Sequence, residues 1–508
     1  MGKITRRDFL RLVWGLSSTT ILAKIFPGTS RLKSEKQLPN FIILVCDAMT
    51  ARNLSLYGYS RKTTPNLERL AERALVYHRH YSNGNYTTPG TSSLLTGLRP
   101  WTHRAINGSG IIKRQLSFHN IFHFLGKDYF RMAYTQNYWA DYLLDQLSSD
   151  IDSLLPLASF DVTGQGAIDQ SFRNDSVVAR HSIERMIYFS NSLLLSFITS
   201  LYYQNQVKRI PANDHPFGLP SGNYFPHRYT LEGLFEGITN KVLEMETEAA
   251  PFFAYFHIFP PHWPYRPRQE FFDLFYQDGY RPVVKPEHRL SHDSSQAKLN
   301  AYRNQYDGYL ANIDAEIGKL IATLEKQGVL DHTYFIITSD HGESFERGMS
   351  GHFTPLLYET LIRIPLIIIA PGNQSRKDCF TLTNSIDILP TILTIAGKEI
   401  PSSCEGSLLP RLGGSDDPKR SIITMDAKEN PAFKPLKRAT FALIRGNYKL
   451  IYYLGYGGMY QDYYEFYNLE EDPEELQDLK AMTNYETVFS EMKQELLAAI
   501  EAANQQYS

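Results

Sequence analysis

The chain has 508 residues, a formal net charge of −2 and 43% apolar residues. This length suits one large domain with a smaller appendage, or two to three average domains. The near-neutral charge gives no indication of nucleic acid or an anionic membrane surface as a partner, so we expect no nucleic acid to bind.

Residues 1–30 have the features of a twin-arginine export signal. Arg6 and Arg7 precede an apolar run from Leu12 to Ala23. The run is too short and too rich in Ser and Thr to span a bilayer comfortably, and Ala23 stands alone where a small-x-small cleavage site is expected. We therefore expect export to the periplasm or another extracytoplasmic space, with a membrane attached only through this segment if it stays uncleaved. A short basic amphipathic N-terminus is the alternative.

The three cysteines are too few and too scattered for a disulfide framework. Cys46 closes an apolar run and is interpreted as a core residue. Cys379 and Cys404 could pair outside the cytoplasm, and spacing alone does not decide this. Twin-arginine export carries folded proteins, often with a metal loaded, which fits an exported metalloenzyme.

Four apolar runs have the character of central strands. They are "NFIILVCD" (40–47), "PFFAYFHIF" (251–259), "TYFIITSD" (333–340) and "IPLIIIAPG" (364–372). Helical patterns occupy residues 64–75, 230–248 and 301–328. Strands that alternate with helices predict an α/β fold with a doubly wound, mainly parallel sheet flanked by helices. Polar groups such as Asp47 and Asp340 should then gather at the carboxyl ends of the strands.

Two regions depart from this alternation. An insert at about residues 140–225 has few strand patterns, and its segment "YFSNSLLLSFITSLYY" predicts a buried helix, with a membrane-surface or substrate-lining element as the alternative. Beyond about residue 420, short antiparallel strands and a final helix are expected. We therefore predict a signal segment at 1–30, a main domain at 38–415 and a small C-terminal α+β subdomain at 416–508.

The segment "TTPGTSSLLTG" predicts a hydroxyl group at the start of a helix. Thr88 is a plausible N-cap and Pro89 suits the first helical position. Thr87 would then lie just outside the helix, where free N–H groups favour an anion. A threonine hydroxyl is a poor nucleophile unless a divalent cation lowers its pKa. Thr87 as a nucleophile therefore requires a metal.

The sequence also provides ligands for such a metal. Asp340 and His341 directly follow one apolar strand, and Asp47 ends another. With Thr87 beside them, they form an O/O/O/N set for one divalent cation, and Ca, Mn, Zn and Mg are not distinguishable. Each residue taken singly also fits a turn or cap. Their coincidence at strand ends favours a metal site.

Several further residues are candidates for supporting roles. His262 and His352 could act as acid and base or stabilise an oxyanion, with ordinary structural histidines as the alternative. His257, on a strand flank, is interpreted as structural. Glu343 is expected to contact a ligand or a turn, and Asp387 to cap the helix that begins at "ILPTIL".

Together these motifs resemble the sulfatase family of the alkaline-phosphatase superfamily. The matching segments are "YGY…TPNLERLA", "TTPGTSSLLTGLRP", "PPHWPYRP", "SDHGESF" and "LYETLIRIPLII". The resemblance spans nearly the whole chain after the signal, apart from the insert. It implies an alkaline-phosphatase-like fold and a hydrolase of sulfuric or phosphoric esters. It also places Thr87 at the nucleophile position and His262 in the site.

The departures from the family pattern are informative. Thr87 stands where arylsulfatases carry the cysteine or serine that becomes formylglycine, and Thr91 replaces the arginine that guides this conversion. Ala48 replaces a second acidic residue, and the segment 136–138 replaces a Lys-x-His segment, so much of the cationic sulfate-binding set is missing. The remaining set is similar to that of phosphoethanolamine transferases and lipoteichoic-acid synthases. Those relatives have several membrane spans, which this sequence lacks.

We expect an exported, metal-dependent hydrolase of phosphate or sulfate esters that uses Thr87 as nucleophile, with phosphotransfer to an acceptor hydroxyl as a second outcome. Phosphoesters are favoured because a threonine ester must be hydrolysed without the elimination route open to an aldehyde hydrate. The substrate would be an anionic ester of a small molecule, a glycan or a lipid head group. A sulfatase proper, acting through Thr87 or metal-bound water, and a non-catalytic binding protein are the alternatives. The sequence does not indicate an oligomeric state.

Overall fold

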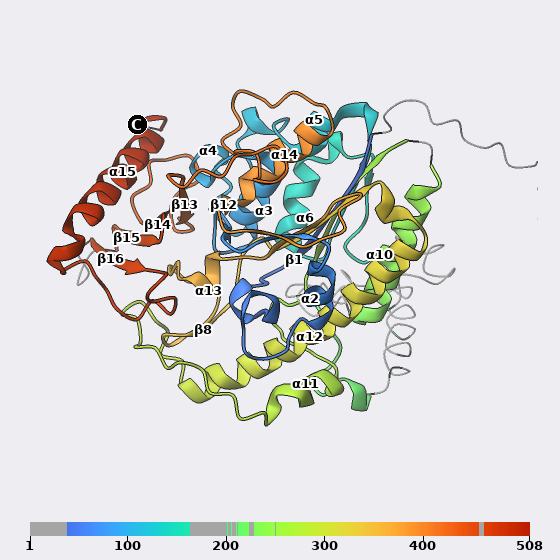
Figure 1. Ribbon diagram of the computed structural model, residues 1–508, viewed down its shortest axis with the longest axis horizontal. Coiled ribbons are helices and arrows are strands. Elements are labelled where there is room, and N and C mark those ends of the chain that lie inside the picture. Colours follow the sequence, from blue (N-terminus) through green and yellow to red (C-terminus); the bar gives the residue numbers. More distant parts are fainter. Residues whose placement is uncertain are drawn as a thin grey trace, which may run out of the picture. The chain divides into compact units, whose positions relative to one another are not determined.

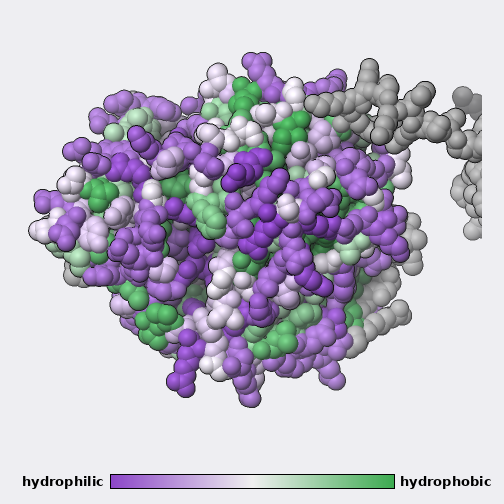
Figure 2. Space-filling view, viewed as in Figure 1, coloured by the Kyte–Doolittle hydropathy of each residue, from purple (hydrophilic) through white to green (hydrophobic). Residues whose placement is uncertain are grey.

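The computed structural model describes residues 38–162, 212–222, 228–248, 250–456 and 462–507, together with residues 201, 205 and 210. The predicted export signal and almost all of the apolar segment at 188–203 lie outside the described residues. Across the described residues, no helix combines the length and the apolar character needed to cross a bilayer. On the face shown in Figure 2, hydrophilic residues predominate and hydrophobic residues form small separate groups.

A mainly parallel sheet lies at the centre of the fold (Figure 1). Within the described residues its order is β11 (Lys377–Cys379), β2 (Leu75–Tyr77), β10 (Leu366–Ile369), β7 (Thr333–Thr338), β1 (Asn40–Cys46), β6 (Phe252–Ile258), β4 (Phe130–Thr135) and β5 (Ser153–Leu154). β1, β6 and β7 coincide with three of the predicted strands, and β1 and β6 are buried over their full length. These three strands run parallel, as predicted.

The run at 364–372 behaves differently from the other predicted strands. It forms β10, which is antiparallel to both of its neighbours, β7 and β2. A strand that runs parallel to the preceding one requires a crossover connection, which carries the chain back to the end of the sheet where the preceding strand began. The link from β7 to β10 holds only the ribbon of β8 (Ser344–Glu346) and β9 (Met349–Gly351) and the single turn α13 (Glu359–Ile362). The chain therefore re-enters the sheet at the end where β7 finishes, and β10 runs antiparallel to β7.

Helices cover both faces of the sheet. One group packs together and contains α2 (Pro65–Ala71), α10 (Leu231–Glu246), α11 (Gln269–Tyr276) and α12 (Gln296–Lys326). The other group contains α3 (Thr87–Thr96), α4 (Pro100–His103), α5 (Ile121–Leu125), α6 (Tyr138–Gln146) and α14 (Ile388–Ile395). The three predicted helices correspond to α2, α10 and α12. α2 ends at Ala71 because β2 begins at Leu75, and α12 starts early because the Ser295 side chain caps it.

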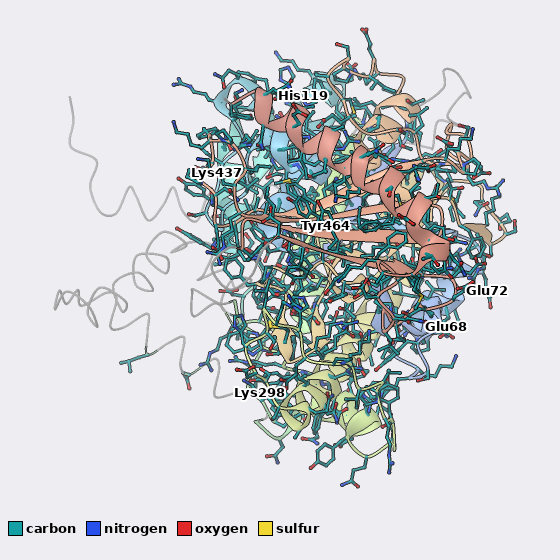
Figure 3. The ribbon with its side chains drawn as sticks, turned by 90° about the vertical axis from the view of Figure 1, so that its left-hand side faces the viewer. Glu68, Glu72, His119, Lys298, Lys437 and Tyr464 are labelled. Atoms are coloured by element: carbon teal, nitrogen blue, oxygen red, sulfur yellow. The ribbon has the colours of Figure 1, made fainter. Side chains whose placement is uncertain are left out.

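The C-terminal region contains a second, antiparallel sheet of β13 (Ser421–Asp426), β14 (Ala439–Arg445), β15 (Tyr448–Leu454) and β16 (Tyr463–Asn468). Helix α15 (Glu486–Gln505) crosses this sheet (Figure 3), and Phe489 packs edge-on against Tyr464. Edge strand β13 also contacts the chain that leads to α3. The backbone N–H of Met425 donates to Asn83 O (3.0 Å), and β13 thereby fixes the approach to Thr87. A further small ribbon joins β3 (His80–Tyr81) and β12 (Thr383–Asn384).

The capping prediction for α3 is wrong, and that for α14 holds for the position of the residue but not for its side chain. Helix α3 begins at Thr87 with the extended residue Tyr86 as its N-cap, and the Thr88 hydroxyl donates to Gly108 O (2.6 Å) instead. Asp387 occupies the N-cap position of α14, but its side chain accepts no hydrogen bond from that helix. Its carboxylate accepts from the backbone N–H of Asn384 (2.7 Å) in a capping box one turn earlier, and it pairs with Arg420 (2.6 Å). In both cases the helical geometry begins before the residue that local sequence preference selects.

All three cysteines are free. Cys46 is buried in the core, as predicted. Cys379 is also buried and is not bonded to Cys404, whose sulfur lies 3.8 Å from Gly97 O. The fold is therefore held by packing and polar contacts rather than by a disulfide between these residues.

Gly90 allows α3 to pack against the end of β7. A Cβ at this position would lie 2.1 Å from the carbonyl oxygen of Asp340, and the backbone atom cannot rotate away as a side chain could. We expect Gly90→Ala to lower the free energy of unfolding by about 3 kcal/mol, measured by urea unfolding. The control is Gly222→Ala, where the nearest atom would be 3.6 Å away. Equal stability of the two variants would contradict this account of the packing.

Candidate active site

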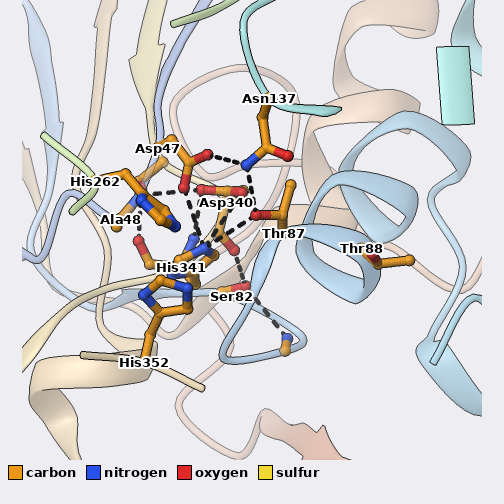
Figure 4. A network of polar contacts seen from close by, with 12 residues as sticks. Asp47, Ala48, Ser82, Thr87, Thr88, Asn137, His262, Asp340, His341 and His352 are labelled. Carbon is orange, nitrogen blue, oxygen red and sulfur yellow. Dashed lines mark hydrogen bonds and ion pairs between the residues drawn. The ribbon is translucent and has the colours of Figure 1, made fainter. Parts of the chain in front are cut away.

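The ends of β1 and β7 bring three polar side chains together (Figure 4). The two strands pair in parallel register, and the Ser339 hydroxyl contacts Cys46 O (2.7 Å) across their ends. Asp47 follows β1, and Asp340 and His341 follow β7. One ligand atom from each of these three buried residues lies within 4.8 Å of the others. The structure therefore brings together the three ligands that were predicted from separate strand ends.

Thr87 lies at the same place, as the first residue of α3. Its hydroxyl oxygen is 3.5 Å from His341 Nε2 and 3.1 Å from Asn137 Nδ2, and the side chain is fully buried. The first backbone N–H groups of a helix have no partner within the helix and favour negative charge nearby. The hydroxyl is thus held where a helix N-terminus meets the carboxylates.

The orientation of the cluster fits a divalent cation. His341 Nδ1 donates to Gly342 O (2.9 Å), so Nε2 is the ring nitrogen that faces Asp47 Oδ1, at 3.2 Å. Asp47 Oδ1 and Asp340 Oδ2 are buried and receive no hydrogen bond from the residues that the structure describes. Two carboxylate oxygens and an imidazole nitrogen are suitable ligands for Mn, Zn, Ca or Mg. These cations differ in how strongly they prefer oxygen over nitrogen ligands.

The pKa values in the cluster reflect the proximity of its charges. Burial and the neighbouring Asp47 raise the pKa of Asp340. Burial alone would raise the pKa of Asp47 too, but His262, His257 and His341 hold it well below its usual range. Burial opposes the charge on His341, yet Asp340 and Asp47 raise its pKa to about 9. Without a cation, a protonated His341 therefore balances the carboxylates.

Metal binding should consequently release a proton. Below the pKa of about 9, His341 carries a proton that must leave before Nε2 can bind a cation. We expect the affinity for Mn²⁺ to rise roughly tenfold per pH unit between about pH 6 and pH 8. Calorimetric titrations in buffers of different ionisation enthalpy would measure the released proton. An affinity that does not change with pH would contradict the assignment of His341 as a ligand.

His257 is closer to the site than its interpretation as a structural residue implied. Its Nε2 lies 3.5 Å from Asp47 Oδ2 and 3.6 Å from Asp340 Oδ2, and neither ring nitrogen has a hydrogen-bond partner within the described part of the chain. Alignment of β6 with β1 could have predicted this position, because His257 pairs with Val45, two residues before Asp47. A parallel β6 beside β1 places both side chains at the same edge of the sheet.

His262 and His352 lie beside each other and next to the cluster. Their ring centroids are 4.7 Å apart, and the His352 ring is 4.2 Å from that of His341. His352 Nδ1 contacts the Glu343 carboxylate (3.0 Å), and His262 Nδ1 contacts Trp263 O (2.5 Å). Burial lowers the pKa of both histidines. Glu343 therefore contacts a neighbour of the ligands, consistent with the supporting role expected for it.

A cleft of about 520 Å³ opens beside these histidines. Asn137, His262 and His352 are among its polar lining residues, and Asn137 contacts the buried Thr87. Seven further lining residues carry aromatic rings: Tyr138, Trp139, Phe259, Trp263, Tyr265, Tyr302 and Phe353. Trp263 and Phe353 remain about half exposed (50% and 52%), so they are not core residues. A cleft of this kind suits a compound with a charged end and a flat, partly apolar body.

Comparison with known protein families shows to which family the chain belongs. The family model described as "Sulfatase" matches residues 39–398. The chain belongs to the sulfatase family. A second model, described as the C-terminal region of N-sulphoglucosamine sulphohydrolase, matches residues 348–502 of this sulfatase-family chain. The predicted family is confirmed, and the protein is a hydrolase acting on ester bonds.

Several relatives cover most of this sulfatase-family chain. The N-acetylglucosamine-6-O-sulfatase of Bacteroides thetaiotaomicron is 24% identical, with 94% of this chain and 88% of the relative covered. The multifunctional alkaline phosphatase superfamily protein PehA of Trinickia caryophylli is 22% identical (86% and 89% covered). The solved phosphonate monoester hydrolase of Agrobacterium radiobacter has a TM-score of 0.68 at 17% identity (92% and 96% covered). This structural match confirms the predicted fold.

Proposed function

We propose that the chain hydrolyses sulfate or phosphate esters of a sugar-like alcohol, with Thr87 as the nucleophile. The observation that carries the proposal is the placement of the Thr87 hydroxyl, 3.5 Å from His341 Nε2 and 3.1 Å from the amide nitrogen of Asn137, which lines the cleft. Retention of Asp47, Asp340 and His341 in orientations suited to a cation argues against a non-catalytic binding protein.

The reaction would proceed in two displacements. The Thr87 oxygen attacks sulfur or phosphorus in line, a Thr87 ester forms, and the bond to the departing alcohol breaks. A divalent cation held by Asp47, Asp340 and His341, beside Thr87, would lower the pKa of the hydroxyl and neutralise charge on the ester. Water then attacks the Thr87 ester, and the threonine oxygen leaves as sulfate or phosphate is released.

The two cleft histidines would carry the protons. The Nδ1 atoms of His262 and His352 are engaged by Trp263 O and the Glu343 carboxylate, so each ring has only Nε2 available to the substrate. We assign these nitrogens to take the Thr87 hydroxyl proton and pass it to the departing alkoxide, and then to take a proton from the attacking water and return it to the Thr87 oxygen.

The cleft supports a sugar ester as substrate. Aromatic side chains stack well on the apolar faces of sugar rings, and the rim residues Trp263 and Phe353 are exposed for such contacts. One relative is named an N-acetylglucosamine-6-O-sulfatase, and a solved relative is described in complex with D-glucosamine-2-N,6-O-disulfate (TM-score 0.63, 18% identity, 93% and 98% covered). Thr87 favours phosphoesters within this class, since it cannot form the aldehyde hydrate of formylglycine enzymes.

A substrate panel tests the proposal. N-acetylglucosamine 6-sulfate, N-acetylglucosamine 6-phosphate, an aryl sulfate and a phosphodiester would be incubated with Mn²⁺-loaded protein and with chelator-treated protein. We expect metal-dependent release of sulfate or phosphate from a sugar ester, and loss of this release in Thr87→Val. No release from any member would support a binding protein, and full release by Thr87→Val would support direct attack by water.

A further inference from the structure

Asn137 is the first residue after the turn that follows β4, and it is the N-cap of α6. Its side-chain oxygen accepts from the backbone N–H of Trp139 (2.8 Å), and its own backbone N–H donates to Thr135 Oγ1 (3.0 Å). An asparagine amide could in principle be turned either way, but the capping contact requires an oxygen at this position. The amide nitrogen must therefore face the cluster.

Both hydrogens of this nitrogen have acceptors in the cluster (Figure 4). Asn137 Nδ2 lies 3.1 Å from Thr87 Oγ1 and 2.6 Å from Asp47 Oδ2. All three residues are buried, with Asn137 only 6% exposed. The contact with Asp47 occupies Oδ2 and leaves Oδ1 without a donor beside His341. One amide thus fixes both the nucleophilic oxygen and the carboxylate next to it.

We propose that Asn137 is a catalytic residue that stabilises negative charge on the Thr87 oxygen; this inference rests on the proposed nucleophilic role of Thr87. In the first displacement, the oxygen–sulfur or oxygen–phosphorus bond forms while the bond to the alcohol breaks. In the second, water forms the new bond, and the Thr87 oxygen takes the electron pair of the breaking bond. The Asn137 N–H donates to that oxygen whenever it is charged.

A neutral amide is well suited to this task. A hydrogen bond to a charged oxygen favours the charged form, and a buried, preoriented donor needs no reorganisation during the reaction. Because the amide does not lose its proton near neutral pH, it remains a donor in both displacements. Its position also requires the Thr87 hydroxyl proton to point elsewhere, since a hydrogen of Nδ2 already occupies one lone pair of Oγ1.

The test is Asn137→Ser, compared with Asn120→Ser. Serine is also a good N-cap, so both variants retain capping and remove an amide donor. Asn120 caps α5 through His123 N (2.9 Å), and its amide nitrogen donates to Asp150 Oδ2 (3.0 Å) and Ser117 O (2.8 Å), so it is also a buried N-cap that donates to a carboxylate. At saturating Mn²⁺, we expect Asn137→Ser to lower kcat about 100-fold to 1,000-fold with little change in KM. Asn120→Ser should stay within about twofold of wild type.

Asn137→Thr provides a second variant, since it also retains a capping oxygen but has no amide donor. It should lose turnover about as strongly as Asn137→Ser. Turnover within about threefold of wild type in either Asn137 variant would overturn the proposal, as would an equal loss in Asn120→Ser. If Thr87→Val itself retains wild-type turnover, the proposed role of Thr87 as nucleophile is wrong. The same set of assays therefore distinguishes a wrong role for Thr87 from a wrong role for Asn137.

Discussion

Replacing Thr87 by valine should reduce kcat by about 10,000-fold or more, with the fold retained. Valine has nearly the shape of threonine but lacks the oxygen, so the displacement has no acceptor atom in the protein. The Thr87 side chain is fully buried, and its hydroxyl contacts only Asn137 and His341 among the hydrogen bonds of the described residues. Initial rates on the best ester of the panel, with circular dichroism to verify folding, would measure the effect.

The neighbouring residue provides a matched control. Thr88 lies one position along the same helix, is equally buried, and donates its hydroxyl to Gly108 O (2.6 Å), away from the metal ligands. Thr88→Val should therefore lose some stability and keep turnover within about threefold of wild type. Equal turnover in Thr87→Val and Thr88→Val would show that Thr87 is not the nucleophile.

Replacing Asp340 by asparagine should have opposite effects on the metal-free and the metal-loaded protein. Burial and Asp47 raise the pKa of Asp340, so its ionised form destabilises the metal-free fold at neutral pH. The neutral variant should therefore be more stable than wild type in the presence of a chelator. It should no longer be stabilised by Mn²⁺, whereas wild type at one hundred times its Kd should gain about 2.7 kcal/mol. Turnover should fall about 1,000-fold or more.

Asp387 is the control for a buried carboxylate without a role in the site. It is fully buried but pairs with Arg420 (2.6 Å) and closes a capping box. Asp387→Asn should lower the Tm with and without metal and leave the response to Mn²⁺ intact. Thermal unfolding with chelator and with Mn²⁺ measures both variants. A chelator-treated Asp340→Asn that is less stable than wild type would contradict the repulsion inferred between Asp340 and Asp47.

The sequence predicted those parts of the fold that follow from local patterns. Long apolar runs marked β1, β6 and β7, and the parallel arrangement of these strands placed Asp47 and Asp340 at one edge. The direction of β10 was not predictable in this way, because it depends on the connection that follows β7 rather than on the residues of the strand. Helix α3 also begins two residues earlier than predicted, with Tyr86 rather than Thr88 as its N-cap.

The residues missed by sequence reasoning act through tertiary contacts. Gly90 matters because the backbone of Asp340 lies against it, and His257 matters because of its register with β1. Asn137 was noticed only as a replacement in the family pattern. Its significance follows from an amide whose orientation is set by the N-cap of α6. Contacts of this kind join segments distant in the sequence, so no local pattern indicates them.

The most direct measurement is peptide mapping by mass spectrometry after rapid acid quenching of Mn²⁺-loaded protein with its best ester. We expect the peptide that contains Thr87 to gain the mass of one sulfuryl or phosphoryl group, with fragmentation assigning the group to the Thr87 oxygen. The adduct should accumulate most in a variant slowed in the second displacement. An unmodified Thr87 at every quench time during sustained turnover, or an adduct on another residue, would contradict the account.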